Sequence, residues 1–150
     1  MTLSKRVLLI VALMLIALVS AACSGGGDSG GGRGRASDAA YAFIDATFKG
    51  EFNALRNAVC EARRGELTAE QEAEITAGLQ AMGGAGSIDS SGITYTFNSE
   101  SNTVTLGGTI KVTVQGTTVD APVDAMFAEG LPVLQEGGSW KVCPTNILGG

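Results

Sequence analysis

The stretch "TVTLGGTIKVTV", residues 103–114, carries a long and regular alternation of apolar and polar side chains. Alternation with a period of two is typical of a β-strand that buries one face. Gly107 and Gly108 interrupt the run, and glycines inside a strand indicate a bulge or a bend. The stretch therefore predicts one long, curved strand. The side chains expected on its buried face are Val104, Leu106, Ile110, Val112 and Val114.

Shorter strand patterns surround this one. "ITYTF", residues 93–97, alternates in the same way, and "QGTT", residues 115–118, is suited to a hairpin turn. The next run has Val119, Ala121, Val123, Ala125 and Phe127 on one face, although Pro122 indicates an edge position or a break there. "LPVLQ" and "WKVC" complete the pattern at residues 131–135 and 140–143. We expect four or five antiparallel strands.

The preceding segment has helical periodicity. A first helix is expected to begin at Ser37 or Asp38 and to end near Gly50. A second follows from Phe52 to Ala62, before Arg63, Arg64 and Gly65. A third begins at Thr68, which has Gln71 at the spacing of a capping box. Three helices followed by strands predict an α+β fold over residues 37–145, with residues 146–150 as a tail.

Residues 1–22 have the layout of a secretory signal. Lys5 and Arg6 precede an apolar run of 13 residues, Val7 to Val19. As a helix this run spans only about 20 Å, less than the hydrocarbon core of a bilayer. A basic start, a short apolar segment and small residues after it indicate a cleaved signal peptide.

Ser20, Ala21 and Ala22 directly precede Cys23, an order that resembles the lipobox of bacterial lipoproteins. The resemblance implies cleavage before Cys23, acylation of this cysteine and attachment to the extracytoplasmic face of the cell membrane. The alternative is ordinary signal-peptidase cleavage, which releases a soluble protein. The glycine-rich residues 23–36 are then a flexible tether, because they contain almost no apolar side chain to bury.

Charge and cysteine content restrict the function further. Removal of residues 1–22 takes two of the 10 basic residues and none of the 15 acidic ones, which leaves about seven net negative charges. This balance argues against nucleic acid as a partner. Cys60 and Cys143 remain as an even pair, which indicates a disulfide in an oxidising compartment; two unpaired thiols are the alternative. Without any histidine, the chain offers no convincing metal site, and no cofactor is expected.

The order of these elements resembles the nuclear transport factor 2-like superfamily, and most closely its small bacterial lipoproteins of uncharacterised function. The likeness rests on "AAYAFIDATFKGEFNALRNAVC" at residues 39–60 and "GGSWKVC" at residues 137–143. It implies a cone, in which a bent sheet wraps a long helix around a cavity. Residues that would line such a pocket, or else fill an ordinary core, are Tyr41, Ile44, Phe48, Tyr95, Phe97 and Trp140.

No catalytic constellation is visible. Histidine is absent, Asp45 lies at the edge of the apolar stripe, and the acids Glu70, Glu72 and Glu74 are typical of a helix start. We therefore expect a non-enzymatic, membrane-anchored domain that binds a small apolar ligand or a partner protein of the envelope. Two alternatives remain. One is an isomerase or dehydratase with a carboxylate buried in the cone. The other is a structural or accessory subunit of the envelope, for which a homodimer formed through the sheet is a possible state.

Overall fold

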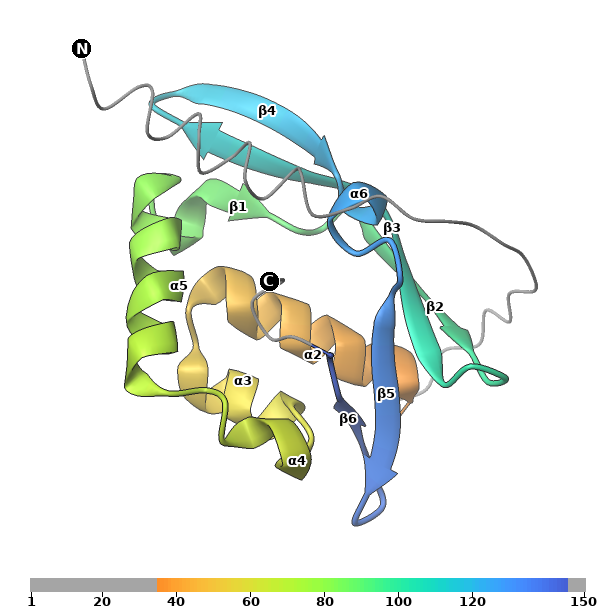
Figure 1. The fold of residues 1–150 in the computed structure, drawn as a ribbon. Coiled ribbons are helices and arrows are strands. Elements are labelled where there is room, and N and C mark those ends of the chain that lie inside the picture. Colours follow the sequence, from red (N-terminus) through yellow and green to blue (C-terminus); the bar gives the residue numbers. More distant parts are fainter. Residues whose placement is uncertain (1–34, 146–150) are drawn as a thin grey trace.

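The computed structural model describes residues 35–145 (Figure 1). Helices come first: α2 (Ala36–Lys49), α3 (Phe52–Ala58), α4 (Glu61–Arg64), α5 (Ala69–Ala81) and a short 3-10 turn (Ala85–Ser87). The strands follow: β1 (Ile88–Asp89), β2 (Ile93–Asn98), β3 (Thr103–Val114), β4 (Thr117–Pro122), β5 (Leu131–Glu136) and β6 (Ser139–Val142), with a helical turn α6 (Val123–Met126) between β4 and β5. The predicted α+β fold, helices before antiparallel strands, is confirmed.

Several sequence predictions concern residues beyond this range. The signal peptide at residues 1–22, the acylation site Cys23, nearly all of the tether and the tail at residues 146–150 lie outside the described residues.

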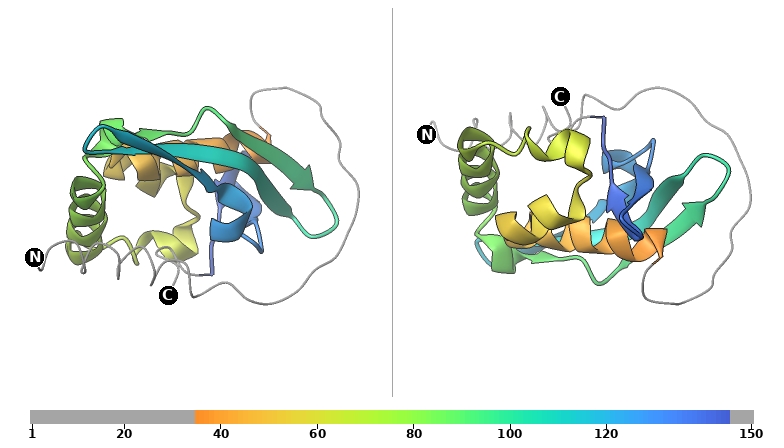
Figure 2. Two further views of the ribbon diagram at one scale, coloured as in Figure 1. Left: turned by 90° about the horizontal axis from the view of Figure 1, so that it is seen from above. Right: turned by 90° about the horizontal axis from the view of Figure 1, so that it is seen from below.

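The long strand β3 is the centre of the six-stranded sheet. β1 and β4 pair with the same part of it, Lys111 and Val112, from opposite edges. β2 and β5 flank its other end in the same way at Thr103 and Val104, and β6 extends the sheet beyond β5. The sheet curls into a half-barrel, and α2 packs against β2, β5 and β6 inside the curl (Figures 1 and 2).

The sheet contains a bulge at the bend, but the bulge lies in the segment between β1 and β2, which faces Gly107 and Gly108, and not in β3 itself. From Ile88 to Ile93 the chain takes five steps, while β3 takes four between their partners Val112 and Gly108. The alternation in β3 keeps its phase across the glycines, and the five predicted side chains of its inner face are all buried or half-buried, although Gly108 between them is exposed. Gly108 has a φ of 88°, and a Cβ there would lie 2.1 Å from the Gly92 carbonyl oxygen. Only glycine allows the two strands to approach this closely.

The run after the hairpin breaks at Pro122, one of the two possibilities that this proline indicated. β4 ends at Pro122, and Val123–Met126 form a helical turn. Proline has no N–H for a sheet ladder, and its fixed φ, here −71°, suits the residue before a helix. Val123 is nevertheless fully buried, because the turn places it against the core. With the two-residue strand β1, which no alternation indicates, the sheet has six strands instead of four or five.

The second predicted helix is also divided. Val59 and Cys60 are extended between α3 and α4, and Val59 forms a parallel bridge with Val142 of β6. The Cys60 N–H donates to the Val142 carbonyl at 2.8 Å. The chain leaves the helix here because the outer edge of β6 offers backbone partners that compete with a helical turn.

Helix boundaries elsewhere follow local signals closely. The capping box at Thr68 and Gln71 is confirmed, and Gly50 ends α2 in the left-handed region at a φ of 67°. α2 begins slightly earlier than expected, with Arg35 as the capping residue; Asp38 accepts from the Arg35 N–H instead of capping the helix itself.

The core lies between α2 and the inner face of the sheet, and it is entirely apolar: no polar or charged residue among residues 35–145 is buried. Its largest fully buried side chains come from α2, α3, the segment between α3 and α4, α6 and the sheet: Ile44, Leu55, Val59, Val123, Val104 and Val142. Leu79 is the one buried residue of α5. This helix stands at the opposite end of the fold from the β2–β3 hairpin (Figure 1).

We expect Gly108→Ala to lower the free energy of unfolding by about 2 kcal/mol or more, because it adds a clash with Gly92 to the strain of a positive φ. Gly116→Ala is the matched control: Gly116 has a φ of 82°, and a Cβ there meets nothing within 4 Å. Its loss should be about 1 kcal/mol. Urea unfolding of both variants measures the difference, and equal losses would show that the Gly92–Gly108 contact does not restrict the bend.

Candidate functional site

The expected pocket residues come from α2, β2 and β6, and they differ in exposure. Ile44 is fully buried, whereas Phe48, Tyr95, Phe97 and Trp140 are half-buried. Tyr41 departs from the expected apolar stripe, since 52% of it is exposed. The structure therefore places Ile44 in the core and brings a group of aromatic side chains to the border between the core and solvent.

Two aromatic pairs connect α2, β2 and β6. The rings of Tyr41 and Tyr95 lie edge to face, with centroids 5.8 Å apart and planes at 78°. The rings of Phe97 and Trp140 have a similar arrangement, at 5.2 Å and 64°. Such pairs contribute about 0.5–1.5 kcal/mol beyond the burial of their area. The second pair joins two strands that are not neighbours in the sheet, so it helps to close the curl.

Three ionisable groups lie near the Tyr41–Tyr95 pair: the Tyr95 hydroxyl, the Asp45 carboxylate and the Lys49 ammonium. Burial raises the pKa of the Tyr95 hydroxyl above its usual value, and the nearby Tyr41 and Asp45 add to this effect. Asp45 itself accepts a hydrogen bond from Lys49 at 2.8 Å, one helical turn later, and is partly exposed. The Asp45 carboxylate is therefore paired with a cation of its own helix and in contact with solvent.

A disulfide joins Cys60 to Cys143, as predicted, with the two Cα atoms 5.2 Å apart. It links the extended segment between α3 and α4 to the chain directly after β6. Cys60 is fully buried, and the Cys143 N–H donates to the Pro132 carbonyl at 2.7 Å. The covalent link is thus embedded in backbone hydrogen bonds on both sides.

Two side chains from the β5–β6 hairpin reinforce the same junction. Both carboxylate oxygens of Glu136 lie 3.1 Å from the Glu61 N–H at the start of α4. The Lys141 ammonium donates to the Asn57 carbonyl in the last turn of α3. Sequence analysis missed both contacts, because each joins residues more than seventy positions apart and no local pattern marks them.

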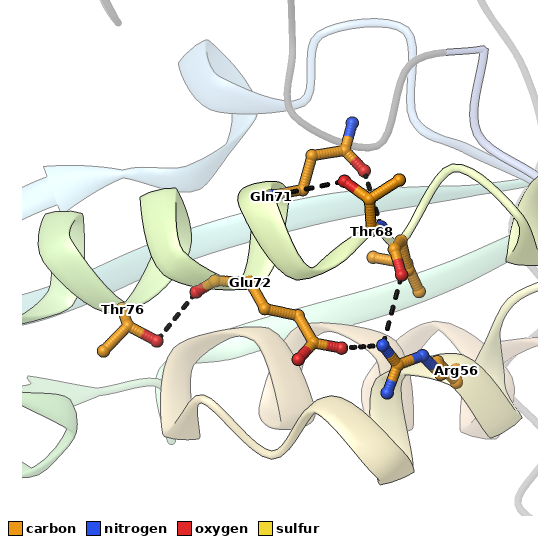
Figure 3. A network of polar contacts seen from close by, with 6 residues as sticks. Arg56, Thr68, Gln71, Glu72 and Thr76 are labelled. Atoms are coloured by element: carbon orange, nitrogen blue, oxygen red, sulfur yellow. Dashed lines mark hydrogen bonds and ion pairs between the residues drawn. The ribbon is translucent and has the colours of Figure 1, made fainter.

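The acidic start of α5 connects this helix to α3. Glu72 pairs with Arg56 of α3, and the Arg56 guanidinium also donates to the Leu67 carbonyl at 3.2 Å (Figure 3). Glu70 and Glu74 are exposed. Over residues 35–145, no group of three or more carboxylates or cysteines is placed to hold a metal ion.

Comparison of the chain with known protein families, with curated proteins and with solved structures found no match. In the described part of the chain, none of the helices combines the length and apolar character that a membrane span requires.

We expect reduction of the Cys60–Cys143 disulfide to lower the free energy of unfolding by about 4 kcal/mol, because it closes a loop across a sequence separation of 83 residues. Urea unfolding with and without reductant measures the effect. Cys23→Ser is the control and should leave both curves unchanged. A reduced chain as stable as the oxidised one would contradict the structural role of this bond.

We expect the Tyr95 hydroxyl to resist ionisation. The signal of the Tyr95 phenolate is obtained by subtracting the ultraviolet titration of Tyr95→Phe from that of the native chain. It should rise only above pH 10, because the usual pKa of a tyrosine hydroxyl is about 10. Above that pH the Tyr95 hydroxyl of the unfolded chain loses its proton before that of the folded chain, so the free energy of unfolding falls as pH rises. In Tyr95→Phe the free energy of unfolding should fall less steeply with pH. A Tyr95 signal centred at the ordinary value would show that its ring is not desolvated.

Proposed function

We propose that this chain is a lipoprotein, cleaved before Cys23 and acylated there, which holds a binding domain at the extracytoplasmic face of a bacterial cell membrane. In this proposal residues 23–36 are the tether and the curled domain that follows is nuclear transport factor 2-like. The domain acts by binding a small apolar ligand or a partner protein of the envelope, and it catalyses no reaction.

The Cys60–Cys143 disulfide carries the proposal, because such bonds persist in oxidising compartments and are rare in the cytosol. It agrees with the signal-like residues 1–22, which would direct the chain out of the cytosol. An acylated cysteine with two or more chains would then give stable membrane attachment.

The character of the core favours binding over catalysis. An isomerase or dehydratase of this fold would use a carboxylate buried inside the cone, yet within residues 35–145 the core holds no charged side chain. What the domain offers instead is aromatic surface at the border of the core, where Tyr41, Tyr95 and Trp140 each combine an apolar ring with a polar atom. Rings of this kind suit the recognition of an apolar molecule or of a protein side chain.

We expect cells that express the chain to incorporate labelled palmitate into it, and Cys23→Ala to abolish both the label and recovery in the membrane fraction. Cys60→Ala/Cys143→Ala is a control for cysteine content and should keep the label on any chain that survives folding. An unlabelled protein recovered from the soluble extracytoplasmic fraction would favour ordinary signal-peptidase cleavage and contradict the anchor.

We expect native mass spectrometry of the membrane-extracted protein to show a bound apolar molecule or a bound protein. If the domain binds through its aromatic border, Trp140→Ala should reduce the bound fraction several-fold, whereas Leu134→Ala, on an exposed site of β5, should leave it unchanged. If both variants kept the same bound fraction, the aromatic border would not be the binding surface.

A further inference from the structure

The outer edge of β4 is open. β4 pairs with β3 along one side, and no strand in the described part of the chain pairs with its other side. Five of its six residues are exposed. Val119 in its centre is 57% exposed, more than the two other large apolar side chains that reach the surface within residues 35–145, Tyr41 and Leu134.

The hairpin turn determines which backbone groups this edge presents. Gln115 and Gly116 both have positive φ, as in a two-residue turn, so Val114 and Thr117 form the hydrogen-bonded pair that closes it. Hydrogen-bonded and non-hydrogen-bonded pairs then alternate. The hydroxyls of Thr113 and Thr118 lie 2.9 Å apart, which agrees with the next pair being the close, non-hydrogen-bonded kind. Thr118 and Asp120 therefore direct their N–H and C=O groups outward.

These groups form a self-complementary set. In an antiparallel pairing of two β4 strands about Val119, Thr118 of each copy stands opposite Asp120 of the other. Each of these two pairs can exchange both of its hydrogen bonds, about four bonds in all. The two Val119 side chains then meet at the non-hydrogen-bonded position, where opposite side chains are closest.

Neighbouring registers are worse. Pairing about Asp120 sets the two Asp120 carboxylates against each other and places Pro122, which lacks an N–H, opposite Thr118. Pairing about Thr118 sets Asp120 against the turn residue Gly116. Of these three registers, only the one centred on Val119 pairs the outward N–H groups of both Thr118 and Asp120 and also covers the exposed Val119 side chain.

The edge of the sheet formed by β2 carries no large exposed apolar side chain comparable to Val119. In β2, Ile93 is buried, and Tyr95 and Phe97 are engaged in the two aromatic pairs. β4 has no lysine and no bulge to block its edge, and Pro122 protects only its end. Its one charged residue, Asp120, stands opposite Thr118 of the other copy in the register about Val119, so the two carboxylates do not face each other.

We propose that two copies of this chain associate through β4, in an antiparallel and two-fold symmetric pairing centred on Val119, to form one continuous sheet. Such a contact uses the same surface on both copies, so it closes as a dimer and does not propagate. The inference does not depend on acylation or on ligand binding.

Oxidative cross-linking of the full chain tests the register. In a Cys23→Ser background, Val119→Cys should form a disulfide-linked dimer, because non-hydrogen-bonded partners have Cα atoms about 4.5 Å apart, within disulfide reach. Thr117→Cys is the matched control on the same face of β4. In this register its two copies lie about 14 Å apart, four residues along the strand, and should give at least tenfold less dimer.

A second variant tests the hydrogen bonds. Asp120→Pro removes an outward N–H and leaves the ladder to β3 intact, so it should weaken self-association of the native chain about tenfold, measured by light scattering across a concentration series. Leu134→Lys should have no effect. Three results would overturn the proposal: a native chain that stays monomeric, equal cross-linking from positions 117 and 119, or a Val119→Cys variant that links only to other proteins. Circular dichroism confirms that each variant is folded.

Discussion

The attachment of the α3–α4 segment to β6 is the constraint on which the fold depends. A half-barrel is open along its borders, and a border strand as short as β6 needs a partner for its backbone. Val59 and Cys60 supply this partner by leaving the helical conformation, and the disulfide to Cys143 makes the arrangement covalent. Glu136 and Lys141 add contacts on either side. The helical half and the sheet are thereby held as one unit around α2.

The same constraint explains how a small apolar core suffices. Within residues 35–145 the core is built mainly of alanine, valine and leucine, with Phe43 as its only buried aromatic residue, and such a core leaves little reserve against the entropy of the chain. Closing a long loop in the unfolded state offsets part of that entropy. The disulfide also restricts where the chain can be stable, because a reducing compartment would remove it. The stability of the fold thus depends on the redox conditions around this one bond.

Local signals in the sequence predicted the elements whose structure depends on neighbouring residues. The alternation of β3, the hairpin turn after it, the capping box at Thr68 and the helix end at Gly50 are all set within a few residues. The break at Val59, the exposure of Tyr41 and the contacts of Glu136 and Lys141 depend on segments far apart in the chain. The helical periodicity that continues past Val59 is real, but pairing with β6 outweighs it. At Pro122 the signal was present in the sequence, since proline indicated a break, and the structure resolves it as a helical turn.

The central claim of this account is that the mature chain is fastened outside the cytosol through Cys23 and braced by Cys60–Cys143. The intact mass of the protein extracted from the membranes of its own host, recorded before and after reduction, tests both parts together. We predict a chain that begins at Cys23, carries the added mass of its acyl groups and gains two hydrogens on reduction. A chain without added lipid mass, whose mass reduction leaves unchanged, would contradict it.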